Sequence, residues 1–499
     1  MPQPNHEIPD VLYSAAQVRA LDAQLVAAGT SGLELMTRAA HAAWRVLRRH
    51  WPNAKAITVL AGHGNNAGDG YLIAVLAQRA GWAVQVLWAV EPSRLSGDAA
   101  AAHAEALAQG VRIEQWRANK PLEGILVDAL LGTGLSGEVR SPYLELIQAI
   151  NASDCPVLCV DIPSGLSADT GAILGDAVKG DVTMTFIGLK LGLFTAQAPA
   201  LVGELAFDSL QADPALTASA AFTACLLQPH NLHWPAARQA TAHKGQFGRV
   251  LVIGGDHGTG GAALLTAESA LRSGAGMLCL ATRAEHVGAA LARLPEVMTS
   301  AVHSSNQLLA LAEPASVLAV GPGLGQGSWG RSMLSVAASQ TKAQVWDADA
   351  LNLLAQGAVT LPAGAVITPH PGEAARLLGI DTAQVQADRP SAALRLAEKY
   401  SAVCVLKGSG SLIASPEGRL ALCAQGHPAM ATAGLGDVLT GLVAALLAQH
   451  LAPFEAASLA VWLHANAGER EGQKGRGLAA SDLIPSVREL LEEIAPCSP

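Results

Sequence analysis

Short apolar runs rich in β-branched residues alternate with alanine-rich stretches along most of this chain. In the first half the apolar runs are Ile57–Ala61, Val84–Ala89, Ile125–Ala129, Val157–Asp161 and Val182–Ile187. In the second half they are Arg249–Gly254, Met277–Ala281, Ser316–Val320, Gln344–Asp347, Ala365–Ile367 and Ala402–Leu406. This alternation is typical of mostly parallel sheets that are covered by helices on both faces. The sequence therefore predicts an α/β protein.

The pattern lapses between Asp208 and Gly245, a stretch that contains three prolines and no sustained period. A chain of 499 residues is also too long for one ordinary hydrophobic core. We therefore predict two domains, residues 1–225 and 226–499. Within them we expect a helix over Gly70–Ala80, a hairpin over Ser411–Leu422, and a long final helix opened by Asp437.

Charge and composition restrict the partners of the protein. The formal net charge is −9, which argues against a nucleic-acid binder, because such a protein needs a basic face to displace counterions. Residues 1–26 lack the pattern of a secretory signal, and the apolar stretch Val438–Ala448 is too short to span a bilayer. The seven cysteines show no paired C-x-x-C spacing, which favours buried reduced thiols. We expect a cytoplasmic protein with no membrane partner.

A glycine-rich segment, Gly62–Gly70, joins the first expected strand to the following helix. Glycines at such a turn let the backbone approach a ligand, and the helix N-terminus offers N–H groups to a pyrophosphate. The segment has neither the G-x-G-x-x-G spacing nor the lysine of a P-loop, so hydride-transfer chemistry is not indicated. The alternative is a turn that only packs a helix on the sheet.

Two other strands of the first half end in polar residues, in the segments DALLGTGL from Asp128 and DIPSGL from Asp161. The carboxyl ends of parallel strands converge on one crevice, so Asn66, Asp128 and Ser164 can face a common point. Their oxygen atoms suit a hard cation. For each aspartate taken singly, a cap for the next helix is an equal alternative.

Together the segments GNNAGDG, DALLGTGL and DIPSGL resemble the NAD(P)H-hydrate epimerase domain, over approximately residues 10–215. The resemblance implies that a potassium ion is bound by Asn66, Asp128 and Ser164. It also implies contacts to the hydrated dinucleotide from Asn65, Asn66, Ala67, Gly68, Asp69, Gly132, Thr133, Gly134, Leu135, Ser136, Gly137, Glu138, Tyr143 and Asp161. Ala67 stands where the family has a second glycine, a change that is tolerable unless the position needs a positive φ.

The chemistry implied for this site is inversion at C6 of the hydrated nicotinamide ring. It requires proton transfer and stabilisation of an opened or dehydrated cationic intermediate. A carboxylate beside the ring can act as base and counter-charge, and Asp161 is our candidate for this catalytic role. The alternative for Asp161 is orienting Ser164 and the turn at Pro163.

The segment Ala431–Gly441 is the most informative part of the second half. Its glycines precede a helix and expose N–H donors where the helix dipole is positive, which favours a phosphoryl group. Asp437 can take a proton from an attacking hydroxyl, or can simply cap the helix. Four other segments, GGD from Gly254, GPGLG from Gly321, TPHPGE from Thr368 and KGSGS from Lys407, end strands at the same expected edge. A ligand crevice at that edge is therefore predicted.

The segments GGDHGTGGAALL, GPGLG, TPHPGE, KGSGS and AGLGD resemble the ADP-dependent NAD(P)H-hydrate dehydratase domain, a relative of ribokinase-like kinases, over about residues 240–490. The resemblance implies nucleotide contacts from Lys407, Gly408, Ser409, Gly410, Ser411 and Gly436. It implies contacts to the hydrated dinucleotide from Ala262, Gly323, His370 and Asp437. Many relatives have threonine where this chain has Leu435, and His370 has loop packing as an alternative role.

The two resemblances together imply a bifunctional repair enzyme with a Rossmann-like and a ribokinase-like three-layer sandwich. It would epimerise the R and S forms of hydrated NADH and NADPH. It would then phosphorylate the C6 hydroxyl of the S form with ADP, with Asp437 as base and Mg²⁺ shielding the phosphates. Loss of phosphate restores NADH or NADPH, and AMP and phosphate are released. The expected partners are these small molecules, and a homo-oligomer is expected.

Two alternatives stay open at this point. The chain can be a vitamin-precursor or sugar kinase with an amino-terminal domain that merely binds a nucleotide, because the anion hole and base of the second half serve kinase chemistry equally well. The first domain can also be a non-catalytic interaction module. The presence of the Asn65–Asn66 loop together with Asp128, Asp161 and Ser164 argues against both alternatives.

Overall fold

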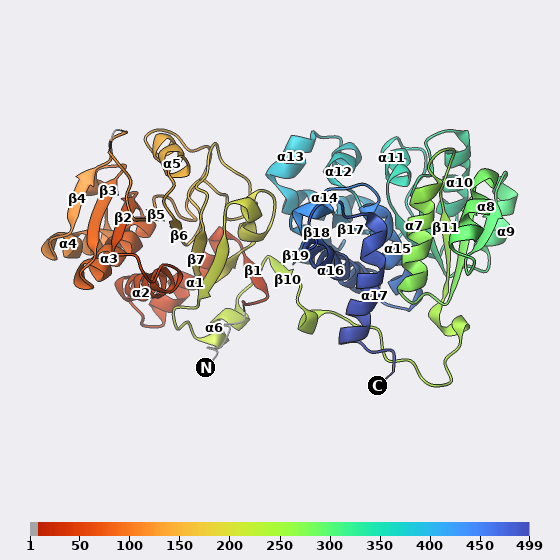
Figure 1. Ribbon diagram of the computed structural model, residues 1–499, viewed down its shortest axis with the longest axis horizontal. Coiled ribbons are helices and arrows are strands. Elements are labelled where there is room, and N and C mark those ends of the chain that lie inside the picture. Colours follow the sequence, from red (N-terminus) through yellow and green to blue (C-terminus); the bar gives the residue numbers. More distant parts are fainter. Residues whose placement is uncertain (1–7, 119, 499) are drawn as a thin grey trace. The chain divides into compact units, whose positions relative to one another are not determined.

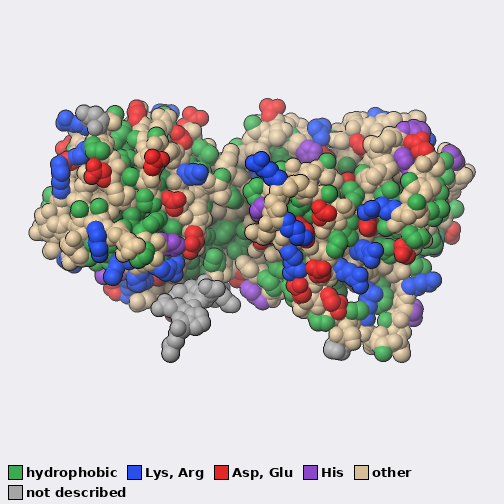
Figure 2. Space-filling model, viewed as in Figure 1, with side chains coloured by type: hydrophobic (Ala, Val, Ile, Leu, Met, Phe, Trp, Pro, Cys, Tyr) green, Lys and Arg blue, Asp and Glu red, His purple; other side chains and the backbone are tan. Residues whose placement is uncertain are grey.

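The computed structural model describes residues 8–118 and 120–498. The chain divides into two compact units, Met1–Cys225 and Leu226–Pro499. Each unit has a sheet with helices on both faces, so the expected α/β class is confirmed (Figure 1). On the face shown in Figure 2, basic and acidic side chains are interspersed. Among the described residues, no helix is long and apolar enough to cross a membrane.

The first unit contains a seven-stranded parallel sheet in the order β4-β3-β2-β5-β6-β7-β9. Its strands are β2 (Ala56–Ala61), β3 (Ala83–Trp88), β4 (Arg112–Gln115), β5 (Ile125–Ala129), β6 (Val157–Val160), β7 (Val182–Phe186) and β9 (Glu204–Asp208). The five predicted strands are confirmed to within one residue at each end. The edge strands β4 and β9 were not predicted, because their partly exposed side chains form no continuous apolar run.

Both faces of this sheet are buried, which explains why its central strands are predominantly apolar. Val59 and Val127 pack with α2 (Gly32–His50) and α3 (Asn65–Arg79). Their neighbours Leu60 and Leu126 point to the opposite face and pack with α5 (Tyr143–Asn151). This alternation follows from the two-residue period of a strand.

The first unit also has further helices and short strands that are not part of the seven-stranded sheet. They are α1 (Ala15–Ala27), α4 (Gly97–Ala108), α6 (Pro214–Ser219) and the short strands β1 (Val11–Tyr13), β8 (Leu189–Lys190) and β10 (Ala224–Leu226). Strand β1 pairs in parallel with β8 and antiparallel with β10. One prediction was wrong in this region: α3 begins at Asn65, five residues before the expected start, because the glycine-rich segment itself forms the first helical turn.

The second unit contains a sheet in the order β13-β12-β11-β14-β15-β16-β17-β18-β19. Its strands are β11 (Arg249–Ile253), β12 (Met277–Thr282), β13 (Met298–Ala301), β14 (Val317–Val320), β15 (Ala343–Trp346), β16 (Val366–Ile367), β17 (Val403–Leu406), β18 (Ser411–Ala414) and β19 (Leu420–Cys423). Pairing is parallel as far as β17 and antiparallel in the last two strands, which form the predicted hairpin. The edge strand β13 was not predicted.

Helices of the second unit flank this sheet (Figure 1). They are α7 (Gly260–Arg272), α8 (Ala284–Arg293), α9 (Ser305–Ala312), α10 (Ser328–Ala338), α11 (Asp349–Ala355), α12 (Pro371–Leu378), α13 (Thr382–Ala387), α14 (Arg389–Tyr400), α15 (Leu435–Ala448), α16 (Pro453–Gly472) and α17 (Leu483–Ile494). The expected final helix is corrected here. Asp437 lies in the first turn of α15, which starts at Leu435, and two further helices follow it.

Candidate active sites

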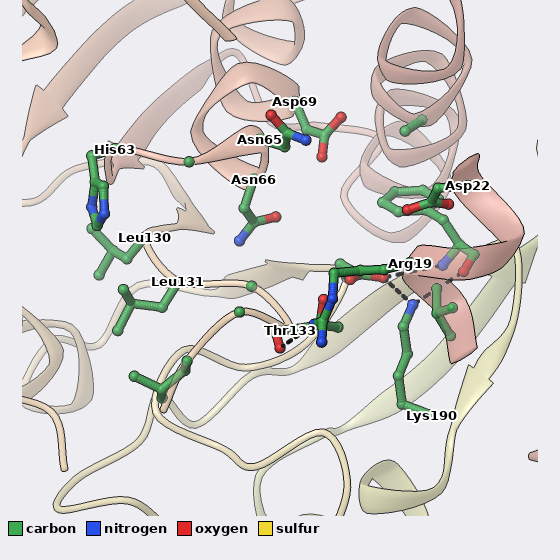
Figure 3. A pocket seen from close by; sticks show the side chains of 18 of the residues that line it. Arg19, Asp22, His63, Asn65, Asn66, Asp69, Leu130, Leu131, Thr133 and Lys190 are labelled. Carbon is green, nitrogen blue, oxygen red and sulfur yellow. Dashed lines mark hydrogen bonds and ion pairs between the residues drawn. The ribbon is translucent and has the colours of Figure 1, made fainter. Parts of the chain in front are cut away.

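A cavity of about 1000 Å³ opens in the first unit at the carboxyl ends of β2, β5 and β6. Its walls come from the loops that follow these strands, from α1 and α2, and from β8. Figure 3 shows His63 at one end of the cavity and the side chains of Arg19, Asp22 and Lys190 at the other. A cavity of this size is at the upper end of small-molecule sites, which suits an extended ligand such as a dinucleotide.

Most of the residues that were expected to contact a dinucleotide line this cavity. They are Asn65, Asn66, Asp69, Gly132, Thr133, Gly134, Leu135, Ser136, Gly137, Glu138, Tyr143 and Asp161. The structure places Ala67 and Gly68 elsewhere: both are buried in the first turn of α3. A Cβ atom added to Gly68 would lie 2.5 Å from the Met36 sulfur, so this residue packs against α2. Ala67 has a helical rather than a positive φ, which explains why alanine fits there.

The three residues of the expected cation site lie around the loop that follows β5. The Ser164 hydroxyl donates to Asp128 Oδ1 at 2.6 Å, and the Ser164 amide donates to Asp128 Oδ2 at 2.8 Å. Asp128 is completely buried, and burial raises its pKa although these hydrogen bonds oppose the shift. Gly132 of the same loop lies against Asn66. A Cβ atom added to Gly132 would be 3.5 Å from the Asn66 Cβ.

The side-chain amide of Asn66 supports a ligand-binding role for the expected cation site. This side chain is only 8% exposed, and neither its amide nitrogen nor its amide oxygen has a hydrogen-bond partner among the described residues. Buried side-chain amides nearly always have hydrogen-bond partners. An unpaired amide that lines a cavity therefore indicates a position where a ligand can bind. An amide oxygen, a carboxylate and a hydroxyl are the donors that a hard cation such as potassium accepts.

Asp161 is held in an unusual backbone and charge environment. Its φ is +68°, in the left-handed region that few aspartates adopt. Its Oδ1 atom accepts a hydrogen bond from the ammonium of Lys190, which is fully buried, and another from the Thr185 hydroxyl at 3.3 Å. The ion pair fixes the carboxylate at the cavity wall.

The sequence analysis missed Lys190, Asp22, Arg19 and His63, all of which line the cavity. Lys190 had a usable signal, because a lysine inside the apolar run from Ile187 to Phe194 needs a partner when it is buried. His63 Nδ1 lies 2.5 Å from the hydroxyl of Tyr143, and burial raises the pKa of Tyr143 to about 12.

In the second unit, the loops after β15, β16 and β17 meet the start of α15. The Lys407 ammonium donates to Asp347 Oδ1 at 2.7 Å and lies 3.9 Å from Glu373 Oε2. The Thr440 hydroxyl of α15 donates to Asp347 Oδ2 at 3.0 Å. A Cβ atom added to Gly436 would lie 3.2 Å from both the Lys407 nitrogen and Asp347 Oδ2. The predicted nucleotide segments around Lys407 and Gly436 are therefore adjacent.

Two carboxyl groups in this cluster have altered acidity. The pKa of Asp437 is raised to about 7, first by burial and then by Asp347, while Lys407 opposes the shift. Burial likewise raises the pKa of Glu373 to about 7, against the opposing charge of Lys407. A carboxylate with a pKa near neutrality is suited to general base catalysis. Asp347 and Glu373 were not singled out from the sequence, although each ends or follows a predicted strand.

The other predicted contact residues of the second unit lie at neighbouring strand ends. Gly323 has a φ of +59° and packs on Thr259, whose hydroxyl donates to the Gly323 carbonyl at 2.8 Å. Ala262 lies in the first turn of α7, one turn before Thr266, whose hydroxyl donates to the Asp437 carbonyl at 3.0 Å. These contacts bring the loops after β11 and β14 to the start of α15.

His370 and the Lys407–Ser411 turn complete the strand-end segments. His370 caps α12, because its Nδ1 atom accepts a hydrogen bond from the Gly372 amide at 3.0 Å. His370 therefore has at least a structural role in this loop. Arg389 is 1% exposed and donates to the Leu406, Lys407 and Gly410 carbonyls, all at 3.3 Å. These bonds hold the backbone of the turn from inside the protein.

Two family models match the chain. A model described as NAD(P)H-hydrate dehydratase matches residues 250–488, and one described as YjeF-related protein N-terminus matches residues 32–192. The chain is 43% identical over 490 residues to the bifunctional NAD(P)H-hydrate repair enzyme Nnr of Coxiella burnetii, covering 96% of this chain and 99% of that protein. It is 41% identical to the Escherichia coli K12 protein of the same name, covering 97% and 94%.

A solved structure resembles part of the chain. It is a ribokinase-like superfamily protein from Enterococcus faecalis V583, 28% identical, with a TM-score of 0.51. The match covers 54% of this chain and 96% of that protein.

Proposed function

The chain belongs to the bifunctional NAD(P)H-hydrate repair enzymes, and from this premise we propose how its residues divide the two reactions. It combines NAD(P)H-hydrate epimerase and NAD(P)H-hydrate dehydratase activities, and the kinase alternative is disfavoured by the near-complete match to repair enzymes. We assign epimerisation to residues 1–225 and dehydration to residues 226–499. We further propose a homo-oligomeric, cytoplasmic protein, which light scattering and cell fractionation test.

The epimerase site is the cavity of the first unit. Asn66, Asp128 and Ser164 would hold a potassium ion, because the unpaired amide of Asn66 and the buried Asp128 carboxylate supply oxygen ligands there. A bound cation would offset the buried negative charge of Asp128. Asp161 borders the same cavity and acts on the hydrated ring as base and counter-charge.

The dehydratase site lies at the start of α15. The turn Lys407–Ser411 and Gly436 bind ADP, while Ala262, Gly323, His370 and Asp437 contact the hydrated dinucleotide. Asp437 takes the proton of the C6 hydroxyl as that oxygen attacks the β-phosphoryl group, and AMP departs. The N–H groups at the start of α15 stabilise the charge on the transferred group. Loss of phosphate from C6 then restores NADH or NADPH.

A magnesium ion fits this site only together with the nucleotide. Magnesium is usually bound by one or two carboxylates plus substrate phosphates, and Asp347 and Glu373 lie beside Lys407 where such phosphates would sit. Among the described residues, no group of three or more His, Cys, Asp or Glu side chains is arranged to hold a metal ion. The ion would neutralise phosphate charge when bound.

The observation that carries the dehydratase assignment is the position of Asp437. It stands at a helix start, its pKa is about 7, and Gly436 beside it allows the close approach of Lys407. A structural cap alone does not need these surroundings.

The epimerase assignment is tested without ADP, so that only the first reaction proceeds. Purified full-length protein is incubated with the R epimer of NADH hydrate, and R and S forms are separated by chromatography. We expect fast conversion to S in potassium chloride and a loss of at least about tenfold when choline replaces potassium, because the buried Asp128 charge is then uncompensated. The Asn66→Ala variant should be slow in both salts. An equal rate in both salts for the unmodified protein would contradict the proposed potassium site.

A further inference from the structure

Asp22 of α1 lies in the epimerase cavity, although α1 contains none of the segments that define the site. Its Oδ1 atom is inaccessible to solvent and has no hydrogen-bond partner within the part of the chain that the structure describes. Figure 3 shows Asp22 at the same end of the cavity as Lys190. A buried carboxylate oxygen without a hydrogen-bond donor lowers the stability of the folded protein. Its presence at a cavity wall therefore suggests a functional role.

Lys190 does not supply the missing hydrogen bond. An ammonium group has three N–H donors. Those of Lys190 go to Asp161 Oδ1, to the Thr185 hydroxyl at 3.0 Å and to the Phe186 carbonyl at 3.1 Å. The two carboxyl groups therefore differ: Asp161 is ion-paired and held by neighbouring donors, whereas Asp22 is left free to gain or lose a proton.

We propose that Asp22 is a second catalytic residue of the epimerase site and exchanges a proton with the oxygen bound to C6. This proposal rests on the epimerase function assigned above. Asymmetry of this kind, with one carboxyl group paired to a lysine and its neighbour without such a partner, is how paired carboxyl groups divide acid and base roles.

The proton and electron balance of the inversion requires two such groups. Asp22 in its acid form gives a proton to the C6 hydroxyl, and the C6–O electron pair leaves with the water formed. The ring is left as a cation that faces the Asp161 carboxylate. A water molecule adds to C6 from the opposite face and gives its surplus proton to Asp161. One proton has passed from Asp22 to Asp161, and exchange with solvent resets the pair.

The charges around Asp22 agree with this role. The pKa of Asp22 is raised to about 6, first by burial and also by Asp161, while Lys190 and Arg19 oppose the shift. Asp69 of α3 faces the same groups, and its pKa is also raised, first by burial and then by Asp161 and Asp22. Because Asp22 must hold its proton at the start of the reaction, the rate should fall as the pH rises past the pKa of Asp22.

The test measures R-to-S conversion by the full-length protein without ADP. In Asp22→Asn we expect kcat to fall by about 100-fold or more with KM changed less than about threefold, the range for loss of a proton-transfer group. The fall in rate on raising the pH through about 6 should vanish with it. Asp22→Glu should recover part of the rate, and its fall in rate with rising pH should occur at a different pH from that of the unmodified protein. Dehydration of the S form with ADP should be unchanged in both variants.

The matched control is Glu34→Gln, which removes an exposed carboxylate of α2 whose ion-pair partner is Arg38. It should leave both reactions unchanged. The proposal is overturned if Asp22→Asn keeps its kcat, or loses affinity alone with an unchanged pH profile. If the asparagine variant does not fold, an unaltered pH limb in Asp22→Glu overturns it equally. Retained epimerisation in Asp161→Asn would instead contradict the assigned function of the site.

Discussion

At the scale of single residues, Asp437 gives the dehydratase site its expected pH dependence. Its pKa is about 7 because burial and Asp347 outweigh the attraction of Lys407. A general base works only when ionised, so dehydration of the S hydrate should fall about tenfold per pH unit below pH 7. The measurement is kcat/KM for S-NADH hydrate at saturating ADP between pH 5 and 9.

Glu373 must be separated from Asp437 in this experiment, because its pKa is also about 7. We expect Glu373→Gln to keep the acid limb of the profile at a reduced rate. Asp437→Asn should leave a residual rate without that limb. If the acid limb of the pH profile disappears in Glu373→Gln and persists in Asp437→Asn, Glu373 is the general base instead.

Single residues also show what the sequence allows one to predict. Asp437, Gly436 and Lys407 stood out because each belongs to a glycine-containing segment after an expected strand, and the structure brings them together. Asp22 did not stand out, because an aspartate in an ordinary helix carries no local signal of the cavity it faces. The charged groups that act on it, Lys190 and Asp161, come from sequence positions more than a hundred residues away, so only the folded sheet brings them near Asp22.

At the scale of elements, α3 depends on glycine for its approach to the sheet. A Cβ atom added to Gly70 would lie 2.6 Å from the Ala129 Cβ and 2.9 Å from the Val59 Cγ1, both in the sheet below. Gly70→Ala should therefore lower the free energy of unfolding of the first unit by about 1–3 kcal/mol, as overpacking usually does. Gly64→Ala is the control, because its added Cβ would meet nothing within 4 Å. Urea unfolding of both variants measures the difference; equal stabilities would disprove this packing.

Elements were predicted well where burial is complete and poorly where it is partial. Strands β2, β5 and β14 are buried and predominantly apolar because helices cover both faces, and the pattern of apolar runs located them. Strands β4, β9 and β13 lie at sheet edges with mixed side chains, so their sequences resemble loops. Helices α3 and α15 both start earlier than predicted, because their glycines enter the first turn instead of preceding it.

At the scale of the whole molecule, each unit has its own core, its own sheet and its own candidate site. The α/β class followed from the alternation of apolar and helical stretches. The Rossmann-like and ribokinase-like types followed from motif resemblance, because many folds share that alternation and differ only in strand order. The strand order of each sheet is set by long-range pairing, which local sequence does not encode.

The central claim is that two separate sites act in sequence on hydrated dinucleotides. The most direct test gives purified protein a mixture of R and S NADH hydrate with ADP, potassium and magnesium, and follows the absorbance of restored dihydronicotinamide. The unmodified protein should restore the whole mixture. Asp161→Asn should restore only the S fraction within the same time, and Asp437→Asn should restore neither. Restoration of both fractions by Asp437→Asn, or of the R fraction at the unmodified rate by Asp161→Asn, would contradict the account.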